Sequence, residues 1–299
     1  MPEGHSIHRI ARQFASVFAG EALRVSSPQG RFAAGAERLD GGVLTGARAH
    51  GKQLFLEFHN ELVLRVHLGL YGAWSFGGDS RFQGASSIGA PRRIGERETA
   101  HDDGAASVYA GPPPPVGAVR VRLASAHGWA DLRGPTACEL ITGAERDAII
   151  AKLGPDPLDP GSDPGEFVAR VQRKRTAVGL SLMNQEVIAG VGNVYRAEAL
   201  FRGRVYPWLP GAALRDDDAA ALWEDLVFLM NDGVRAGRII TTAPSHREGP
   251  AGTDSGVPVE DAHYVYKRTG LACRICGTMV AMAEMGARKL YWCPSCQAA

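Results

Sequence analysis

The sequence of 299 residues predicts an α+β protein with three parts: a strand-rich N-terminal domain, a helical domain and a C-terminal zinc-binding hairpin. Three observations support this fold class. Apolar residues alternate with polar ones at strand spacing in the first half of the chain, the spacing becomes helical after Leu140, and four cysteines close the chain in two Cys-x₂-Cys pairs. The length suffices for two globular domains and a small zinc module.

The N-terminal domain is predicted to begin with an amphipathic helix over residues 7–18. Its apolar residues share one helical face: Ile7, Ile10, Ala11, Phe14, Val17 and Phe18. Two strands, Gln53–Phe58 and Leu62–Val66, flank a short turn and predict a β-hairpin. Residues 119–123 alternate between apolar residues and arginine, as in a half-buried strand. The Gly- and Ala-rich segment Gly84–Val116, which ends in four prolines, is interpreted as a long mobile insertion.

Helix-capping signals mark the second domain. Thr142 and Glu145 form a capping box before an apolar run, and Asp163 before a proline is a typical helix start. Further apolar stripes at helical spacing follow, and the polar segment Arg247–Asp261 then precedes the terminal hairpin. The predicted domains therefore cover residues 1–140, 141–263 and 264–299.

The two Cys-x₂-Cys pairs are separated by sixteen residues. This spacing allows a β-hairpin to place four thiolates around one tetrahedral Zn²⁺, with the ligands Cys273, Cys276, Cys293 and Cys296. Disulfides are the weaker interpretation, because a fifth cysteine, Cys138, would be left over and no secretory leader is recognisable. About thirty residues bury too small a core to fold alone, so we expect the zinc to be structural.

The composition argues against a membrane or exported protein. No apolar run reaches membrane-spanning length, and zinc-bound thiols suit a reducing cytoplasm. The formal net charge of +1 hides an uneven distribution. Basic residues gather in the middle of the chain and in the zinc module: Arg170, Arg173, Lys174, Arg175, Arg196, Arg202 and Arg204, then Lys267, Arg268, Arg274, Arg288 and Lys289.

The first residues offer a nucleophile. Methionine before proline is normally removed, which would leave Pro2 as a secondary amine beside the Glu3 carboxylate. An α-amino group has a pKa near 8 in model peptides, so a useful fraction is neutral at physiological pH. Such an amine can form an iminium with a carbonyl-like carbon while the carboxyl group moves protons. The alternative is an ordinary start of the chain.

The segment Gly190-Val-Gly192-Asn193 lies between two predicted helices. Glycines allow positive φ and close approach of a phosphate, and backbone N–H groups and the Asn193 amide can donate to phosphate oxygens at a helix start. A tight helix-to-helix turn is the equally plausible structural interpretation. The basic residues Lys174 and Arg175 on the preceding helix favour an anion.

Taken together, these motifs resemble one family. They are Met1-Pro2-Glu3-Gly4, His50-Gly51-Lys52, the segment Gln185–Tyr195 and the terminal Cys-x₂-Cys…Tyr-Trp-Cys-Pro-Ser-Cys. In unchanged order from the first residue to Cys296, they are similar to the formamidopyrimidine-DNA glycosylase and endonuclease VIII family of base-excision repair enzymes. The resemblance implies a β-sandwich with an N-terminal helix, a helical domain with a helix-two-turn-helix motif, and a zinc-finger β-hairpin.

The chain resembles the endonuclease VIII branch more closely. Leu70 and Tyr71 stand where that branch carries residues that fill the gap left by a flipped base, a task that suits an apolar wedge and an aromatic plane. Ordinary core packing is the alternative for both. Gly69 departs from the polar residue usual there, which puts part of the opposite-strand contact in doubt. Asp131-Leu-Arg133 lacks the pattern of the formamidopyrimidine branch and weakens an 8-oxoguanine assignment.

The resemblance also implies roles. Pro2 would attack C1′ of the damaged nucleotide, Glu3 would transfer protons, and Lys52 would approach the lesion phosphate. β- and δ-elimination would then cut the strand. Asn193 and Arg288, with Lys174, would hold phosphates, since a guanidinium offers a bidentate fork to them. The expected partner is double-stranded or bubble DNA with oxidised bases or abasic sites, bound by a monomer in the cytoplasm at the nucleoid.

Other interpretations stay open beside this one. The chain could bind damaged or abasic DNA without turnover, or act as an 8-oxoguanine or formamidopyrimidine-type glycosylase. Pro2, Glu3 and Lys52 favour an enzyme, because a binding protein would not need them. His5 and His8 share a helical face but are interpreted as a solvated pair rather than a metal site.

Overall fold

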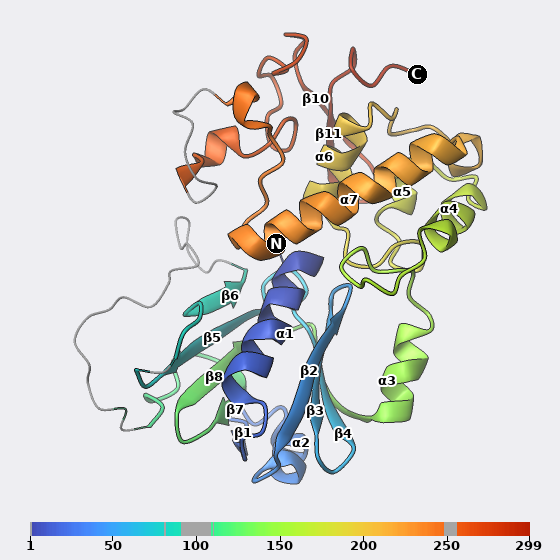
Figure 1. Cartoon of the computed structure of the whole chain (residues 1–299). Coiled ribbons are helices and arrows are strands. Elements are labelled where there is room, and N and C mark those ends of the chain that lie inside the picture. Colours follow the sequence, from blue (N-terminus) through green and yellow to red (C-terminus); the bar gives the residue numbers. More distant parts are fainter. Residues whose placement is uncertain (1, 81, 91–108, 110, 248–255) are drawn as a thin grey trace. The chain divides into compact units, whose positions relative to one another are not determined.

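The computed structural model describes residues 2–80, 82–90, 109, 111–247 and 256–299 (Figure 1). Most of the predicted insertion Gly84–Val116 and half of the segment Arg247–Asp261 lie outside these residues. The chain divides into two compact units, Met1–Ala151 and Lys152–Ala299. None of the helices in the described ranges is long and apolar enough to cross a membrane.

The first unit is the predicted β-sandwich with its N-terminal helix. One sheet has the order β2 (Leu44–His50), β3 (Gln53–Phe58), β4 (Leu62–His67) and β9 (Ala137–Thr142). The other has the order β1 (Arg24–Ser26), β7 (Val119–Ala124), β8 (Gly128–Arg133), β5 (Ala73–Gly78) and β6 (Ser87–Gly89). All neighbouring strands are antiparallel.

Helix α1 (Gly4–Phe18) packs into the same core as both sheets. Phe14 is fully buried and meets Trp74 of β5 edge to face at 4.8 Å between ring centroids. Two shorter helices, α2 (Ala33–Leu39) and α3 (Gly143–Ile150), complete the described part of the unit. The predicted capping box at α3 is confirmed: Thr142 Oγ1 accepts from the Glu145 N–H, and the Glu145 carboxylate accepts from the Thr142 N–H.

Two parts of the predicted insertion are ordered rather than mobile. Residues Ser87–Gly89 form the edge strand β6, paired with β5. Near the end of the segment, the Pro113 carbonyl accepts from Arg122 at 2.7 Å and the Val116 carbonyl accepts from Arg133 at 2.8 Å. The interpretation of the whole segment as mobile was therefore wrong at both ends.

The second unit is helical and ends in a hairpin. Its helices are α4 (Pro164–Gln172), α5 (Val178–Ser181), α6 (Asn193–Arg202) and α7 (Asp216–Ala236), with short 3₁₀ turns at Gly211–Ala213, Pro244–His246 and Val259–Asp261. The carboxylate of Asp163 caps α4 by accepting from the Gly165 N–H at 2.9 Å, as the sequence predicts. Strands β10 (Ala281–Glu284) and β11 (Lys289–Trp292) form the predicted antiparallel hairpin.

Candidate active site

The predicted catalytic residues of the first unit come from one end of it. The C-terminal end of α1 lies at the start of β2, because the Gly20 N–H donates to the Leu44 carbonyl at 2.8 Å. α1 has 15 residues and β2 has 7, so both are about 22 Å long, and α1 packs along β2. The start of α1 therefore lies at the end of β2, where the Gly51–Lys52 turn follows (Figure 1).

The turn that carries Lys52 is a tight one. His50 pairs with Gln53, so only Gly51 and Lys52 connect β2 to β3. Gly51 has φ +56°, which fits a type II′ turn with glycine in its first position. Lys52 is half-buried. Burial of the His67 imidazole at the end of β4, and next the positive charge of Lys52, lower the pKa of His67. The Lys52 ammonium and the His67 imidazole are therefore close to each other at this end of the sheet.

Pro2 and Glu3 are both buried at the start of α1. Glu3 is the N-cap residue in extended conformation, and its carbonyl accepts from the Ser6 N–H at 3.0 Å. Its side chain does not cap the helix. A carboxyl group at this position lies near the positive end of the helix dipole and is shielded from bulk water. It is therefore suited to exchange protons with a bound group.

His5 adds a residue that sequence reasoning misplaced. It is only 5% exposed, so the interpretation of a solvated His5–His8 pair is wrong for this residue. Burial, and next the charge of Arg9, lower the pKa of His5 to about 3. Its neutral imidazole lies 3.2 Å from Ser6 Oγ. The helical period of α1 places His5 opposite Ile7 and on the same side as Arg9, one turn further on. The sequence therefore indicated the nearby charge but not the burial of His5.

The loop between β4 and β5 lies at the same end of the sheet, because His67 pairs with Gln53 next to the Lys52 turn. Leu70 is 38% and Tyr71 is 80% exposed. The alternative that these two side chains are ordinary core is therefore wrong. An exposed leucine and tyrosine on a short loop can enter a base stack.

Gly69 has a structural reason to be glycine. Its φ is +66°, and a Cβ at this position would lie 1.8 Å from Thr136 Oγ1. The Thr136 N–H in turn donates to the His67 carbonyl at 2.9 Å, which fixes the neighbouring loop against this one. A polar side chain at position 69 would therefore require Thr136 to shift and would adopt an unfavourable positive φ.

In the second unit, the Gly190–Asn193 segment is a closed turn before α6. The side chain of Gln185 spans it, accepting from the Gly190 N–H at 3.0 Å and donating to the Val191 carbonyl at 3.1 Å. Gly190 has φ +88°. Asn193, the first residue of α6, is 7% exposed and donates through Nδ2 to the Lys289 carbonyl at 2.9 Å. The Gly190–Asn193 segment is therefore a tight turn before a helix, and its Asn193 side chain also contacts the zinc hairpin.

Arg288 lies at the tip of the zinc hairpin. Gly286 and Ala287 have φ of +61° and +54°, the signature of a two-residue type I′ turn. The turn is closed by the Met285 N–H, which donates to the Arg288 carbonyl at 2.8 Å. The Arg288 side chain is half-buried beside Lys289, whose carbonyl binds Asn193. The structure thus brings the two predicted phosphate ligands of this unit into adjacent positions.

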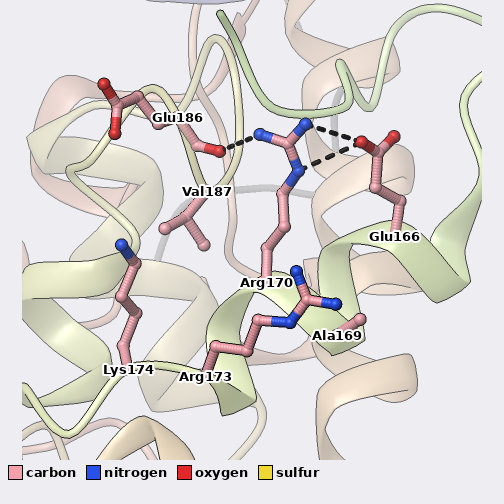
Figure 2. A pocket seen from close by; sticks show the side chains of 7 residues that line it. All are labelled: Glu166, Ala169, Arg170, Arg173, Lys174, Glu186 and Val187. Atoms are coloured by element: carbon pink, nitrogen blue, oxygen red, sulfur yellow. Dashed lines mark hydrogen bonds and ion pairs between the residues drawn. The ribbon is translucent and has the colours of Figure 1, made fainter.

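Lys174 lies in a different place. It lines a surface pocket of about 470 Å³ with Arg173 beyond the end of α4 (Figure 2). Arg170 in the same pocket donates to Glu166 Oε1 at 2.6 and 3.0 Å and to the Glu186 carbonyl. Glu186 is exposed and contributes its backbone carbonyl rather than its carboxylate to this contact.

The four cysteines have the geometry of a zinc site. Their Sγ atoms all lie within 4.8 Å of one another. Cys273 and Cys296 are 3.9 Å apart and Cys276 and Cys293 are 3.4 Å apart, close to the roughly 3.8 Å expected for thiolates in tetrahedral coordination. All four positions are protein ligands, so the zinc is structural and offers no site for a water.

Three parts of the chain match models of known protein domains. Residues 1–127 match the formamidopyrimidine-DNA glycosylase N-terminal domain, residues 153–245 match the formamidopyrimidine-DNA glycosylase H2TH domain, and residues 270–299 match a zinc finger found in FPG and IleRS. Endonuclease 8 1 of Mycobacterium tuberculosis is 41% identical over 297 residues, which is 99% of this chain and 100% of the relative. Probable endonuclease 8 2 of Streptomyces coelicolor is 28% identical over 100% of this chain and 94% of that protein.

A solved structure has the same fold. The complex between Lactococcus lactis Fpg and an abasic site containing DNA matches with a TM-score of 0.73 at 18% identity, covering 99% of this chain and 100% of that one. Sequence and fold together show that the chain belongs to the formamidopyrimidine-DNA glycosylase and endonuclease VIII family of DNA repair glycosylases. The endonuclease 8 relative matches over nearly the whole chain, as the resemblance to that branch predicts.

Proposed function

We propose that this DNA repair glycosylase is bifunctional, removing oxidised bases, chiefly pyrimidines, and cutting the strand by β,δ-elimination through a Schiff base on Pro2. The observation that carries the proposal is the set of groups at one end of the first unit. The Pro2 nitrogen and a buried carboxyl group at the start of α1 lie at the same end as the Lys52 turn and the exposed Leu70–Tyr71 loop.

The chemistry follows from these groups. The Pro2 nitrogen is a secondary amine once Met1 is removed, and it forms a bond to C1′ while the bond from C1′ to the damaged base breaks. The base leaves with the bonding electron pair and takes up a proton, which balances the N–H proton that Pro2 loses. Glu3 protonates the ring oxygen, so that the sugar opens and the positive charge rests on an iminium. The iminium acidifies C2′. Loss of that proton expels the 3′ phosphate, and a second elimination expels the 5′ phosphate.

The remaining residues hold the substrate. Lys52 supplies a positive charge for the lesion phosphate from a turn that leaves little freedom to the backbone. Leu70 and Tyr71 replace the stacking lost when the damaged nucleotide leaves the helix. Asn193 and Arg288 contact phosphates, supported by the adjacency of their turns, and Lys174 with Arg173 adds a more remote basic surface. We expect a monomer that acts in the cytoplasm at the nucleoid.

Borohydride trapping tests the reaction class. The protein is incubated with an oligonucleotide that contains an abasic site, and the iminium is reduced to a stable covalent adduct. The native N-terminus is expected to give the adduct, and a variant with an uncleaved tag before Pro2 is expected to give none. Binding of the oligonucleotide without an adduct from the native protein would instead support a non-catalytic damage-binding protein.

Substrate choice needs a separate panel. Labelled duplexes with thymine glycol, 5-hydroxyuracil, dihydrouracil and 8-oxoguanine are compared at equal enzyme concentration. Faster release of the three pyrimidine lesions is expected. Preference for 8-oxoguanine would favour the formamidopyrimidine type of activity.

A further inference from the structure

Arg196, in the first turn of α6, is a fully buried arginine outside the groups that touch DNA in the proposed function. Removing a guanidinium from water is costly unless hydrogen-bond acceptors replace the lost hydration. The groups that accept from Arg196 therefore show what its burial stabilises.

Those acceptors surround the Arg288 turn. Arg196 Nη1 lies 3.4 Å from the Met285 carbonyl, and Nη2 lies 3.4 Å from the Lys289 carbonyl. Met285 and Lys289 are the residues immediately outside the segment Gly286–Arg288. One planar guanidinium thus contacts the backbone on both sides of the hairpin tip.

The same guanidinium joins this turn to α5 and to Asn193. Nη1 also lies 3.4 Å from the Gly179 carbonyl of α5, and Nη2 donates to Asn193 Oδ1. Because Oδ1 accepts from Arg196, Nδ2 of Asn193 is directed to the Lys289 carbonyl, to which it donates at 2.9 Å. Arg196 therefore orients the amide of one predicted phosphate ligand and the backbone that carries the other.

Close packing reinforces this arrangement. A Cβ on Gly179 would lie 2.7 Å from Met285 Sδ, and a Cβ on Gly286 would lie 2.8 Å from Leu180 Cδ2. The hairpin tip is thus seated against α5, and a methyl group at either glycine would require the Met285 or Leu180 side chain to shift. A change of side chain at Gly179 should displace the tip even with Arg196 in place.

We propose that Arg196 is a positioning residue that holds Arg288 and Asn193 in the geometry for phosphate binding. The proposal rests on the proposed function, because it assumes that these two residues contact DNA. Lysine is a poor replacement, since a single ammonium has no planar fork with which to reach acceptors on opposite sides. Arg196 acts through Arg288 and does not itself touch the DNA.

A double-mutant cycle tests this coupling. Arg196→Met, Arg288→Ala and the double variant are compared for binding to a duplex with a stable abasic-site analogue. If Arg196 acts through Arg288, each single variant should lose about tenfold in affinity. The double variant should then bind at most about threefold more weakly than Arg288→Ala. Both single variants should also lower the salt slope of log K by about one, because the same phosphate contact is lost.

Arg202→Met is the matched control. Arg202 is on the same helix and bonds Asp225 and the Thr241 carbonyl, away from the hairpin tip. Arg202→Met should lower the free energy of unfolding but leave the salt slope of log K unchanged. Bound zinc and thermal unfolding are measured for every variant, and Arg196→Lys and Gly179→Ala are expected to keep the zinc and to lose affinity like Arg196→Met.

The outcomes separate the two claims. If the unmodified protein binds abasic DNA, two results would show that Arg196 does not position Arg288 and would overturn the proposal. They are losses from Arg196→Met and Arg288→Ala that multiply, and an unchanged salt slope for Arg196→Met. If the unmodified protein neither binds abasic DNA nor forms the borohydride adduct, the proposed function fails instead. Should Arg196→Met lose its zinc or fail to fold, Arg196→Lys, which keeps the charge, replaces it in the cycle with Arg288→Ala.

Discussion

At the scale of single residues, Gly69 combines a strained conformation with a filled space. Any side chain there would adopt φ +66° and collide with Thr136 Oγ1. Gly69→Ala should therefore lower the free energy of unfolding by about 2–3 kcal/mol, from backbone strain together with the collision. Urea denaturation measures this loss.

Gly20→Ala separates the two causes. Gly20 also has positive φ, at +85°, but a Cβ there meets nothing within 4 Å. Gly20→Ala should lower the free energy of unfolding only by the contribution of backbone strain, about 1 kcal/mol. Equal losses for the two variants would show that Thr136 moves aside at no cost.

Leu70 and Tyr71 lie on the surface, so their removal should separate function from stability. Leu70→Ala and Tyr71→Ala should change the free energy of unfolding by less than about 0.5 kcal/mol each. Excision from a lesion duplex should fall about tenfold or more, because the flipped state loses its replacement stacking. Single-turnover kinetics checks this, with Val259→Ala, at an exposed valine of the second unit, as the control. Unchanged excision would remove both residues from the DNA contact.

His5 should make stability depend on pH. Its folded-state pKa of about 3 lies below the unfolded value of about 6.5, so the unfolded chain binds the extra proton between these values. Stability is therefore full above pH 6.5 and falls as pH decreases. The expected contribution is about 2 kcal/mol lost between pH 7 and pH 5. His5→Gln should show a smaller loss over this interval in thermal unfolding, and an equal loss would exclude His5 as a source.

Residue chemistry was more predictable than residue environment. The types and spacing of Pro2, Glu3 and Lys52 indicated their chemistry, because few other functions need an amine, a carboxyl and an ammonium in those motifs. The collision at Gly69 depends on Thr136, which is far away in the chain and gives no local signal. The charge of Arg9 lies one helical turn from His5 and is visible in the sequence, but the burial of His5 is not.

At the scale of elements, the zinc hairpin shares its core with α6. Ala197 and Phe201 of α6 pack with Tyr264, Val280 and Tyr291 of the module. The buried Glu198 carboxylate also accepts the backbone N–H groups of residues 264–266 at 2.7–2.9 Å. The module is therefore anchored by α6 as well as by its metal, which the cysteine spacing alone did not reveal.

Removal of zinc should release the hairpin tip while the Glu198 anchor remains. Chelation should lower affinity for abasic DNA at least tenfold, because Arg288 is no longer held. At saturating DNA, the rate of borohydride adduct formation should change by less than about threefold, since Pro2 belongs to the other unit. Added zinc should restore binding. Equal loss of binding and adduct rate would contradict a purely structural metal.

Helix ends and hairpins with a local sequence signal formed where the sequence predicted them. The capping box of α3, the Asp163 cap of α4 and the β3–β4 hairpin all formed as predicted. The edge strand Ser87–Gly89 was missed because its Gly- and Ala-rich surroundings resemble a loop, and only pairing with β5 defines it.

At the scale of the whole molecule, we propose different tasks for the two compact units. In this proposal the first unit contributes the attacking amine and the loop that enters the base stack, and the second contributes phosphate ligands on a zinc-supported turn. We propose residues 1–140, 141–263 and 264–299 as the functional parts. The fold class was predictable because four motifs occur in family order, whereas lesion preference depends on loop shapes that no motif encodes.

The central claim is that the nucleophile is the Pro2 nitrogen. Borohydride-trapped protein is digested and the cross-linked peptide is sequenced by mass spectrometry. We expect the DNA remnant on the N-terminal peptide that begins with Pro2. We also expect Lys52→Ala to form the same adduct, but at a lower rate. An adduct on Lys52 or on any other lysine would contradict it.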